Sequence, residues 1–331
     1  MSEDIDFVVI WVDGGDPEWR REYAKYKPGA RAEQNDTRDI RFRDWENLKY
    51  WFRGVEKFAP WVRAVHFVTC GHYPSWLNLN APKLRFVKHS DYIPGQYLPV
   101  FNSHPIEVNL HRIQGLSEQF VYFNDDMFLI KPVKPERFFR NGLPCDLAAL
   151  NANSTNESVH IVYNDLHIIN RNFIKKAVFG KSFFKWYNPK YGTAMLRTIA
   201  LSPWPRFTGF VDPHLPNSFF KSTFEKVWPI AEAKLWETTS HRFRDISDVN
   251  QYLFRYWQLM ESNFYPYNVY KDSIAIDIED VNLDKIDRVI RNQKKAVLCI
   301  NDTERIDFEK AKQQINSAFA SILPEKSTFE L

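Results

Sequence analysis

The chain has 331 residues, long enough for one large α/β domain or two smaller ones with a well-filled core. Its formal net charge of only +3 argues against a basic nucleic-acid-binding surface. The three cysteines, Cys70, Cys145 and Cys299, are odd in number and lie in or near apolar runs, so we expect buried free thiols in a reducing compartment and no disulfide framework.

The N-terminal segment has acidic residues where a secretory signal has basic ones, and its apolar run is short. No stretch approaches the roughly 20 consecutive apolar residues that span a bilayer. We therefore expect a cytoplasmic protein, either free or held peripherally at the inner face of the membrane.

Three apolar runs far apart in the sequence end in acidic side chains. The groups that follow these runs are Asp13, the pair Asp125 and Asp126, and Asp302. If the three strands are parallel neighbours, their carboxylates meet at one edge of one sheet, where open α/β sheets bind ligands. Carboxylates there suit Mg²⁺ or Mn²⁺ and nucleotide phosphates. A polar turn between two strands explains the central Asn-Asp-Asp sequence about equally well when it is taken alone.

Residues 36–44 contain three arginines and three aspartates. This run is either a solvated loop with internal ion pairs or a set of guanidinium groups that hold phosphate beside a strand-end crevice.

The first half of the chain alternates strands and helices. Residues 45–59 space apolar side chains along one helical face, and strands are expected at 62–69 and 84–88. This order predicts an α/β fold with a mostly parallel, Rossmann-like sheet. Neither GxGxxG nor GxxxxGK[ST] occurs, so the chain lacks a dinucleotide fingerprint and a P-loop.

A further helix is expected from Ser103 to about Leu116. Ser103 is a suitable N-cap, and the helix start would offer amide donors to an anion. His104 and Glu107 would face the same side one turn apart, which is explained more simply as a local pair than as a catalytic couple.

Residues 145–210 have few glycines, many aromatics and helix-like stretches such as 168–179, which predicts a helical insertion or cap over the sheet.

His214 follows between two prolines, a context that fixes an imidazole, although a loop histidine bonded to the backbone is the alternative. Basic groups in 241–248 precede a helix over 249–262 and concentrate positive potential where a diphosphate needs it. Asp245 or Asp248 is equally explained as an N-terminal cap.

The remaining elements are one or two helices over 219–238, strands at 274–278 and 297–300, and an amphipathic helix over 308–322. We predict a single catalytic domain, 5–331. Its parts are a nucleotide-binding half-sheet (1–144), the insertion or cap (145–210), a catalytic half (211–302) and a C-terminal helix (303–331).

Several short motifs follow one another in a fixed order. They are IDFVVIWVDGGDP at 5–17, Arg43-Asp44, FNSH at 101–104, FNDD at 123–126, HLP at 214–216, Arg244 with Asp248, and IND at 300–302. This order resembles the four conserved regions of the Stealth family. These are hexose-1-phosphate transferases of bacterial capsule and exopolysaccharide synthesis, related to the catalytic core of the lysosomal-enzyme N-acetylglucosamine-1-phosphotransferase. Where the family's helix after Asn-Ser-His usually begins with Ala, this chain has Pro105, which a first helical turn accepts.

The resemblance implies a nucleotide-sugar-binding sheet of the GT-A type. It implies transfer of hexose-1-phosphate, expected to be N-acetylhexosamine-1-phosphate, from a UDP-sugar to a glycan hydroxyl with release of UMP. The implied cofactor is a divalent cation, Mg²⁺ or Mn²⁺. The expected partners are a UDP-sugar donor, an oligo- or polysaccharide acceptor and the capsule-assembly machinery, and no nucleic acid.

The resemblance also implies roles for individual residues. The catalytic set is Asp125, Asp126, His214, Arg244 and Asp302, and the three aspartates of that set would hold the metal. The nucleotide-sugar would be bound by Trp11, Asp13, Gly14, Arg43, Asp44, Asn102, Ser103, His104 and Asn124.

Two other readings of the sequence lead to different functions. In an ordinary metal-dependent glycosyltransferase, Asn124-Asp125-Asp126 would be a DxD-like metal motif, attack would occur at the anomeric carbon, and UDP would be released. In a glycan-binding module without turnover, the abundant aromatic side chains would carry the function and the acidic groups would be incidental.

Overall fold

The computed structural model describes residues 4–27, 42–153, 159–304 and 306–331. A central five-stranded sheet has the order β3-β2-β1-β4-β8. Its first four strands are parallel and β8 is antiparallel to β4. The strands of this sheet are β1 (Ile5–Ile10), β2 (Val65–Thr69), β3 (Leu84–Lys88), β4 (Gln119–Phe123) and β8 (Asn217–Phe220).

The central strands are mostly apolar and buried because helices cover the sheet on both faces. In β1, Phe7 lies opposite Val65 of β2 on one side and Val121 of β4 on the other. All three side chains are fully buried. This arrangement confirms the predicted α/β class with a mostly parallel sheet, and it brings the C-terminal ends of β1 and β4 side by side.

The expected position of the last strand is wrong. β11 (Val297–Asn301) lies in a separate three-stranded sheet with the order β10-β11-β5. It runs parallel to β10 (Ser273–Asp277) and antiparallel to β5 (Met127–Leu129). The reason is that the chain turns at Asn124–Asp126 and leaves the first sheet, so that β5 begins the second one. A turn of three residues therefore joins the two sheets.

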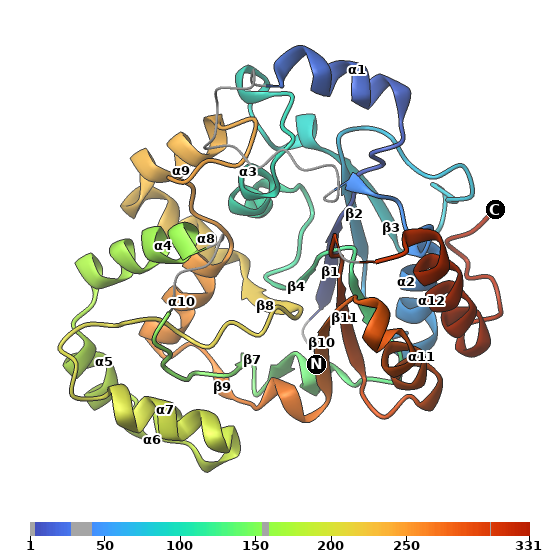
Figure 1. Cartoon of the computed structure of the whole chain (residues 1–331). Coiled ribbons are helices and arrows are strands. Elements are labelled where there is room, and N and C mark those ends of the chain that lie inside the picture. Colours follow the sequence, from blue (N-terminus) through green and yellow to red (C-terminus); the bar gives the residue numbers. More distant parts are fainter. Residues whose placement is uncertain (1–3, 28–41, 154–158, 305) are drawn as a thin grey trace.

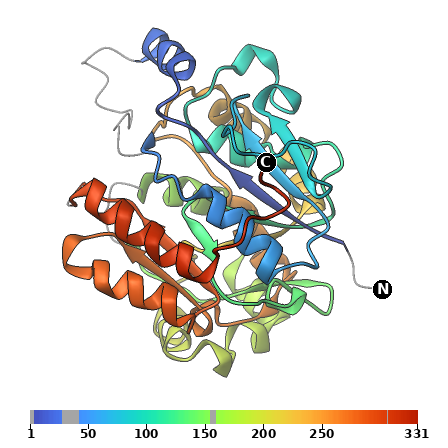
Figure 2. The same cartoon turned by 90° about the vertical axis from the view of Figure 1, so that its right-hand side faces the viewer.

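Helices flank the strands on both sides (Figure 1). On one side lie α2 (Leu48–Phe58), α11 (Leu283–Asn292) and α12 (Phe308–Ile322). On the other side lie α3 (Ser103–Val108), α8 (Lys221–Ile230), α9 (Glu232–Ser240) and α10 (Tyr252–Glu261). Helix α1 (Pro17–Tyr26) projects beyond the strand ends, as Figure 2 also shows.

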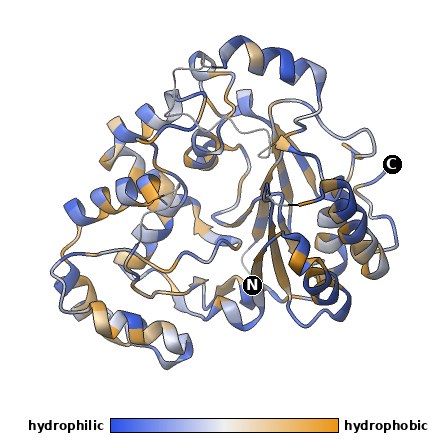
Figure 3. Cartoon of the chain, viewed as in Figure 1, coloured by the Kyte–Doolittle hydropathy of each residue, from blue (hydrophilic) through white to orange (hydrophobic). Residues whose placement is uncertain are grey.

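Figure 3 shows the alternation of apolar and polar residues along the flanking helices. In α12 the buried positions are Ala311, Ile315, Ala318, Phe319 and Ile322, which follow the helical period and confirm the predicted helix and its bounds. The predicted helix at 45–59 is also present, and its first turn begins three residues later, at Leu48.

Three predicted elements differ from those observed. Helix α3 ends at Val108, and a 3₁₀ turn over Leu110–Arg112 replaces the rest of the helix predicted to reach Leu116. The predicted helix 168–179 is divided between two helices. The first ends at Asn172, and the second begins at Lys175. The start of the predicted helical region 219–238 belongs to strand β8, which the sequence analysis missed together with helix α11.

Residues 145–210 are largely helical, as predicted. The helices are α4 (Val159–Asn172), α5 (Lys175–Lys181), α6 (Phe183–Trp186) and α7 (Thr193–Leu201). A small sheet of β6 (Phe139–Arg140), β7 (Leu143–Asp146) and β9 (Tyr265–Pro266) lies at their base. Helices α5 to α7 form the lower left edge of the molecule in Figure 1.

Two expectations about single features can be compared with the fold. Cys145 and Cys299 are buried free thiols, but Cys70 is exposed, so the expectation of three buried cysteines is wrong. Cys70 follows β2 directly, at the strand end where the chain leaves the core. In the described part of the chain, none of the helices combines the length and apolar character needed to cross a membrane.

Candidate active site

A pocket of about 880 Å³ lies where β1, β4, β10 and β11 end. This is the size range of small-molecule and cofactor sites. The pocket is lined by eleven of the fourteen residues that the sequence analysis assigned to the site. These are Trp11, Arg43, Asp44, Asn102, Ser103, Asn124, Asp125, Asp126, His214, Arg244 and Asp302.

The other three predicted residues, Asp13, Gly14 and His104, do not line the pocket. The Asp13 carboxylate accepts a hydrogen bond from the Gly15 amide at 2.7 Å, which closes the turn after β1. A Cβ atom on Gly14 would lie 2.0 Å from the Phe42 carbonyl oxygen, so only glycine fits there. Both residues therefore shape the turn that carries Trp11 into the pocket.

The Asn124-Asp125-Asp126 turn brings two carboxylates into the pocket. Asn124 is held by the Tyr122 hydroxyl, which donates to its side-chain oxygen at 2.7 Å. Burial raises the pKa of Asp125 to about 7, and the negative charge of Asp126 adds to this effect. One Asp126 carboxylate oxygen, Oδ1, is buried and has no hydrogen-bond partner. The turn thus holds two acidic groups close together without enough donors to neutralise them.

His214 lies opposite this turn. Its Nε2 is 3.5 Å from Asp126 Oδ2. The backbone of His214 has φ +43°, a left-handed conformation between two prolines that directs the ring into the pocket. Burial lowers the pKa of His214, but Asp126 outweighs that effect, and the net result is a pKa above the usual value.

Asp302 enters the pocket from the second sheet. Its Oδ2 accepts a hydrogen bond from Trp45 Nε1 at 3.2 Å, and its Oδ1 is 3.8 Å from Arg43 Nη1. Burial raises the pKa of Asp302, and Arg43 offsets part of that effect. Burial also raises the pKa of the neighbouring Asp44. The acidic groups predicted at the ends of β4 and β11 therefore meet in the pocket, although two sheets supply them, whereas Asp13 after β1 does not line it.

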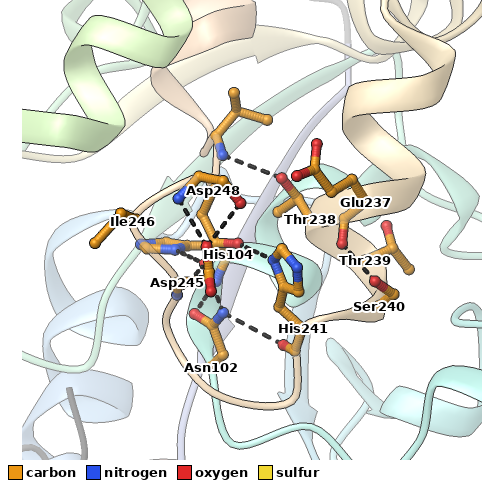
Figure 4. Close-up of polar contacts among 12 residues, drawn as sticks. Asn102, His104, Glu237, Thr238, Thr239, Ser240, His241, Asp245, Ile246 and Asp248 are labelled. Carbon is orange, nitrogen blue, oxygen red and sulfur yellow. Dashed lines mark hydrogen bonds and ion pairs between the residues drawn. The ribbon is translucent and has the colours of Figure 1, made fainter. Parts of the chain in front are cut away.

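A buried network around Asp248 lies behind the part of the pocket wall that Asn102, Ser103 and Arg244 form (Figure 4). The carboxylate is fully buried, with its Oδ2 2.8 Å from His104 Nδ1 and its Oδ1 2.7 Å from His241 Nδ1. Asn102 Nδ2 donates to the same carboxylate at 2.8 Å, and the Asp245 amide donates at 3.1 Å. Asp248 therefore connects the start of α3 to the loop after α9, and is not a cap of α10, which begins at Tyr252.

Arg244 belongs to this loop. Its Nη2 donates to Ser103 Oγ at 3.3 Å, at the start of α3. His104 and Glu107 do not form the local pair expected from their spacing. His104 binds Asp248, whereas Glu107 Oε1 lies 3.1 Å from the Tyr122 hydroxyl oxygen. The Asp248 network thus sets the position of a guanidinium and a helix N-terminus on the same side of the pocket.

The donor set of the pocket fits a cation. Among the described residues, one group of possible ligand atoms lies within 4.8 Å of one another, and it consists of Asp126, His214 and Cys299. Asp125 and Asp302, predicted as ligands, line the same pocket but are not part of this group. Asp126 Oδ1 and Asp302 Oδ1 lack hydrogen-bond partners and the pKa of Asp125 is raised, so negative charge is costly in this pocket and a divalent ion would offset that cost.

Several lining residues were missed from the sequence. Asp277 is the last residue of β10 and Glu279 lies two residues beyond it, so this strand also ends in acidic groups, and Asn301 Nδ2 donates to Asp277 at 2.7 Å. Trp19 and Phe101 line the pocket as part of a small aromatic cluster between α1 and α3. The acidic residues at the end of β10 could have been recognised from the sequence, because they repeat the pattern of an apolar strand that ends in acidic residues. The arginines and aspartates at 36–41 lie outside the described residues.

Comparison with known proteins identifies the family. The chain matches the sequence models of Stealth protein conserved region 1 over residues 3–31 and conserved region 2 over residues 41–145. It is 41% identical to the capsular polysaccharide phosphotransferase WcwK of Streptococcus pneumoniae, covering 99% of this chain and 98% of that one. It is 43% identical to the exopolysaccharide phosphotransferase cps2G of Lactiplantibacillus plantarum, covering 99% and 96%.

A solved structure of the galactosyltransferase LgtC in complex with donor and acceptor sugar analogues covers 94% of this chain and 95% of its own. Its TM-score is 0.41 at 10% identity, which is too low a likeness to transfer any feature of that protein. The relatives matched along nearly the whole length are the informative ones. They show that this chain belongs to the Stealth family of phosphotransferases.

Proposed function

We propose that this protein transfers hexose-1-phosphate, with N-acetylhexosamine-1-phosphate as the expected group, from a UDP-sugar to a hydroxyl of a glycan in capsule or exopolysaccharide synthesis. The observation that carries the proposal is the convergence of Asp126, His214, Arg244 and Asp302 on one pocket from four distant segments. The relatives WcwK and cps2G are named as capsular polysaccharide and exopolysaccharide phosphotransferases, which supports this substrate class.

In the proposed reaction the acceptor hydroxyl oxygen attacks the β-phosphorus of the UDP-sugar. A new P–O bond forms, the bond from the β-phosphorus to the oxygen bridging the two phosphates breaks, and UMP leaves with that oxygen. The products are UMP and a sugar linked to the glycan by a phosphodiester. Positioning and electrostatic stabilisation supply most of the catalysis in such transfers.

His214 is the proposed general base. In its neutral form it accepts the proton of the acceptor hydroxyl, and Asp126 at 3.5 Å stabilises the imidazolium that results. Asp125 is the second candidate, because a carboxyl with a pKa of about 7 is also suited to accept a proton at neutral pH. Arg244 is proposed to stabilise the charge that develops on the transferred phosphoryl group.

The proposed cofactor is Mg²⁺ or Mn²⁺, which prefer carboxylate oxygens. Asp125, Asp126 and Asp302 are the proposed ligands, with His214 close to Asp126. A bound divalent ion would neutralise phosphate charge and orient the pyrophosphate. Cys299 is a poor ligand for these metals, because burial raises the pKa of its thiol and a thiol suits softer metals.

The remaining site residues are proposed to hold the nucleotide-sugar. Trp11 and Asn124 line the pocket at the ends of β1 and β4, while Arg43 and Asp44 line it beside Asp302. Ser103 is the first residue of α3, after the N-cap Asn102, which accepts from the His104 amide, and the Ser103 hydroxyl lies beside Arg244. Asp13, Gly14, Asn102 and His104 would act by positioning these groups. The proposed location is the cytoplasm, with peripheral contact at the inner face of the membrane and with the capsule-assembly machinery.

The decisive experiment is to identify the released nucleotide. The protein is incubated with a panel of UDP-sugars, Mg²⁺ or Mn²⁺ and short acceptor oligosaccharides, and the nucleotides are separated by chromatography. Release of UMP together with a phosphodiester-linked product supports the proposal. Release of UDP would establish attack at the anomeric carbon instead, and glycan binding without turnover would establish a binding module.

A further inference from the structure

Helices α5, α6 and α7 and the loop after them carry an unusual number of exposed apolar side chains. We call residues 174–206 the helical corner. In the described part of the chain, six of the fifteen exposed large apolar side chains lie within it. They are Ile174 (74% exposed), Phe183 (51%), Phe184 (83%), Leu196 (61%), Ile199 (49%) and Trp204 (55%). Single exposed apolar residues are normal, but a concentration of them marks an interaction surface.

Two sets of contacts join the start of α5 and the end of α6 to the C-terminal end of α7 and the loop after it. Lys175 Nζ donates to the carbonyl oxygens of Leu201 at 2.7 Å and Trp204 at 3.0 Å, which fixes the start of α5 against the loop after α7. The hydroxyl groups of Tyr187 and Ser202 lie 2.6 Å apart. The Phe183 ring packs against Tyr187 with ring centroids 4.5 Å apart and an angle of 30° between the ring planes. Ile174, Phe183 and Trp204 therefore flank one helix end.

The charged side chains of the helical corner and of the residues that flank it are all positive. Residues 166–211 contain eight Lys and Arg residues and no Asp or Glu. Because the whole chain has a net charge of +3 and this segment has +8, the rest of the chain has a net charge of −5. Six of the eight cations are exposed, namely Arg171, Lys176, Lys181, Lys190, Arg197 and Arg206. Exposed cations and exposed apolar groups thus occur together in this stretch of the chain.

We propose that the helical corner docks on an anionic lipid bilayer. Aromatic and aliphatic side chains that enter the headgroup boundary, with lysines and arginines around them, are the chemistry of interfacial membrane binding. Exposed aromatic rings and cations would also suit an acidic glycan. The aliphatic groups Ile174, Leu196 and Ile199 decide between the two, because they have no planar face for a sugar and gain by leaving water for acyl chains.

The corner and the pocket are separate surfaces. None of the residues that line the pocket belongs to 174–206. In Figures 1 and 3 the corner lies at the edge of the molecule, away from the C-terminal ends of the central strands. Docking therefore leaves the candidate active site unobstructed. The inference does not depend on the proposed reaction.

The test is flotation of the full chain with vesicles. Vesicles of phosphatidylglycerol mixed with phosphatidylcholine are compared with vesicles of phosphatidylcholine alone, at about 0.1 M and about 0.5 M salt, where electrostatic attraction is strong and then screened. An apolar variant carries Phe184→Ser and Leu196→Ser. A charge variant carries Lys176→Gln, Lys181→Gln and Arg206→Gln. The matched controls carry Ile230→Ser with Val281→Ser, and Lys285→Gln with Lys294→Gln and Lys310→Gln, all at exposed positions elsewhere.

The expected result is binding to the anionic vesicles that is at least about tenfold stronger than to neutral ones and that falls with salt. Both corner variants should lose at least about tenfold of this binding, and both controls should keep it. Lipids brominated in the acyl chains should quench tryptophan fluorescence less in Trp204→Phe than in the unaltered chain. Thermal unfolding by circular dichroism checks that all variants fold.

Three results would overturn the inference. The first is equal vesicle binding by the corner variants and the unaltered chain. The second is a combined result: neither the unaltered chain nor any variant binds vesicles, and the corner variants lose binding to an immobilised acidic polysaccharide. This result would assign the surface to a glycan. The third is that the unaltered chain forms an oligomer in solution and the apolar variant does not. Phosphotransfer to a soluble acceptor should be unchanged in the corner variants, so that failure of the proposed reaction and failure of membrane docking remain separate outcomes.

Discussion

His104 Nδ1 lies 2.8 Å from Asp248 Oδ2, and this contact ties helix α3 to the loop that carries Arg244. The two residues are 144 positions apart in the sequence. His241, in the same loop as Asp248, completes the network at 2.7 Å from the other carboxylate oxygen. One buried carboxylate thereby sets the position of a guanidinium that faces the pocket, although the carboxylate itself is not part of the pocket wall.

Replacing Asp248 with Asn should therefore impair catalysis without removing any group that touches the substrate. An amide cannot accept from both histidines and from Asn102 at once, so the Arg244 loop loses its fixed position. We expect kcat/KM to fall by about tenfold to a hundredfold, as for other residues that orient a functional group. The measurement is steady-state UMP release. Asp287→Asn, in a surface ion pair with Arg291, is the matched control and should leave the rate unchanged. An unaltered rate in Asp248→Asn would show that the network does not position Arg244.

The same carboxylate should make stability depend on pH. Burial tends to raise the pKa of Asp248, but the hydrogen bonds from His104, His241 and Asn102 outweigh it and lower the pKa to about 2. A group whose pKa is depressed in the folded state stabilises above its unfolded value and loses that contribution as pH falls through its folded value. The free energy of unfolding should therefore exceed that of Asp248→Asn by about 2 kcal/mol near neutral pH, and the gap should close between about pH 4 and pH 2. Urea titrations at a series of pH values measure the gap. A gap that stays constant across this range would contradict the assignment.

Arg244 should matter through its shape as well as its charge. Arg244→Ala is expected to reduce kcat by about a hundredfold or more, the usual loss when a donor to a developing charge is removed. Arg244→Lys keeps the charge but not the planar fork, and should recover only part of the rate. Single-turnover kinetics with saturating donor separate this effect from weaker binding. Full activity in Arg244→Lys would indicate that a point charge suffices.

Gly14 should tolerate no side chain. A Cβ atom there would meet the Phe42 carbonyl oxygen at 2.0 Å, so Gly14→Ala must displace the turn that carries Trp11. We expect a loss of about 1–3 kcal/mol in unfolding free energy, the usual cost of overpacking, together with a raised KM for the donor. Gly95→Ala is the matched control, since no atom lies within 4 Å of its added Cβ. Equal stability of the two variants would show that the turn adapts.

Removal of divalent ions should abolish turnover and leave the fold intact. A chelator is expected to stop UMP release, and added Mg²⁺ or Mn²⁺ should restore it. Mn²⁺ binding followed by electron paramagnetic resonance gives a second readout that does not depend on activity. Asp126→Ala should weaken Mn²⁺ binding by about tenfold or more, whereas Asp287→Ala should not. Full turnover in the presence of the chelator would remove the cation from the mechanism.

Much of the fold was predictable because local patterns determine it. The buried runs of β1, β4 and β11 and the helical period of α12 indicated their structures without any tertiary information. The strand ends indicated the pocket carboxylates Asp125, Asp126 and Asp302, and the family resemblance indicated the other predicted lining residues. The pairing of β11 was not predictable, since an apolar strand does not reveal whether its neighbour is β4 or the three-residue β5 that follows the turn.

The missed elements have specific causes. The sequence Asn217–Phe220 is too short to show alternation, and it becomes a strand because β4 offers it an edge. The network around Asp248 depends on side chains from two distant segments, and in the sequence Asp248 has the same appearance as a helix cap. Tertiary contact decides both cases.

The uneven charge of the chain has a consequence for its motion. Residues 166–211, which contain the helical corner, have a net charge of +8 against −5 for the rest of the chain, and this separation gives the molecule a large electric dipole moment. Within the last nanometre or so before contact, where ionic screening at physiological salt still leaves a field, a negative surface exerts a torque on such a dipole. The protein should therefore arrive at any such surface already turned, with fewer unproductive collisions than a randomly oriented body would make.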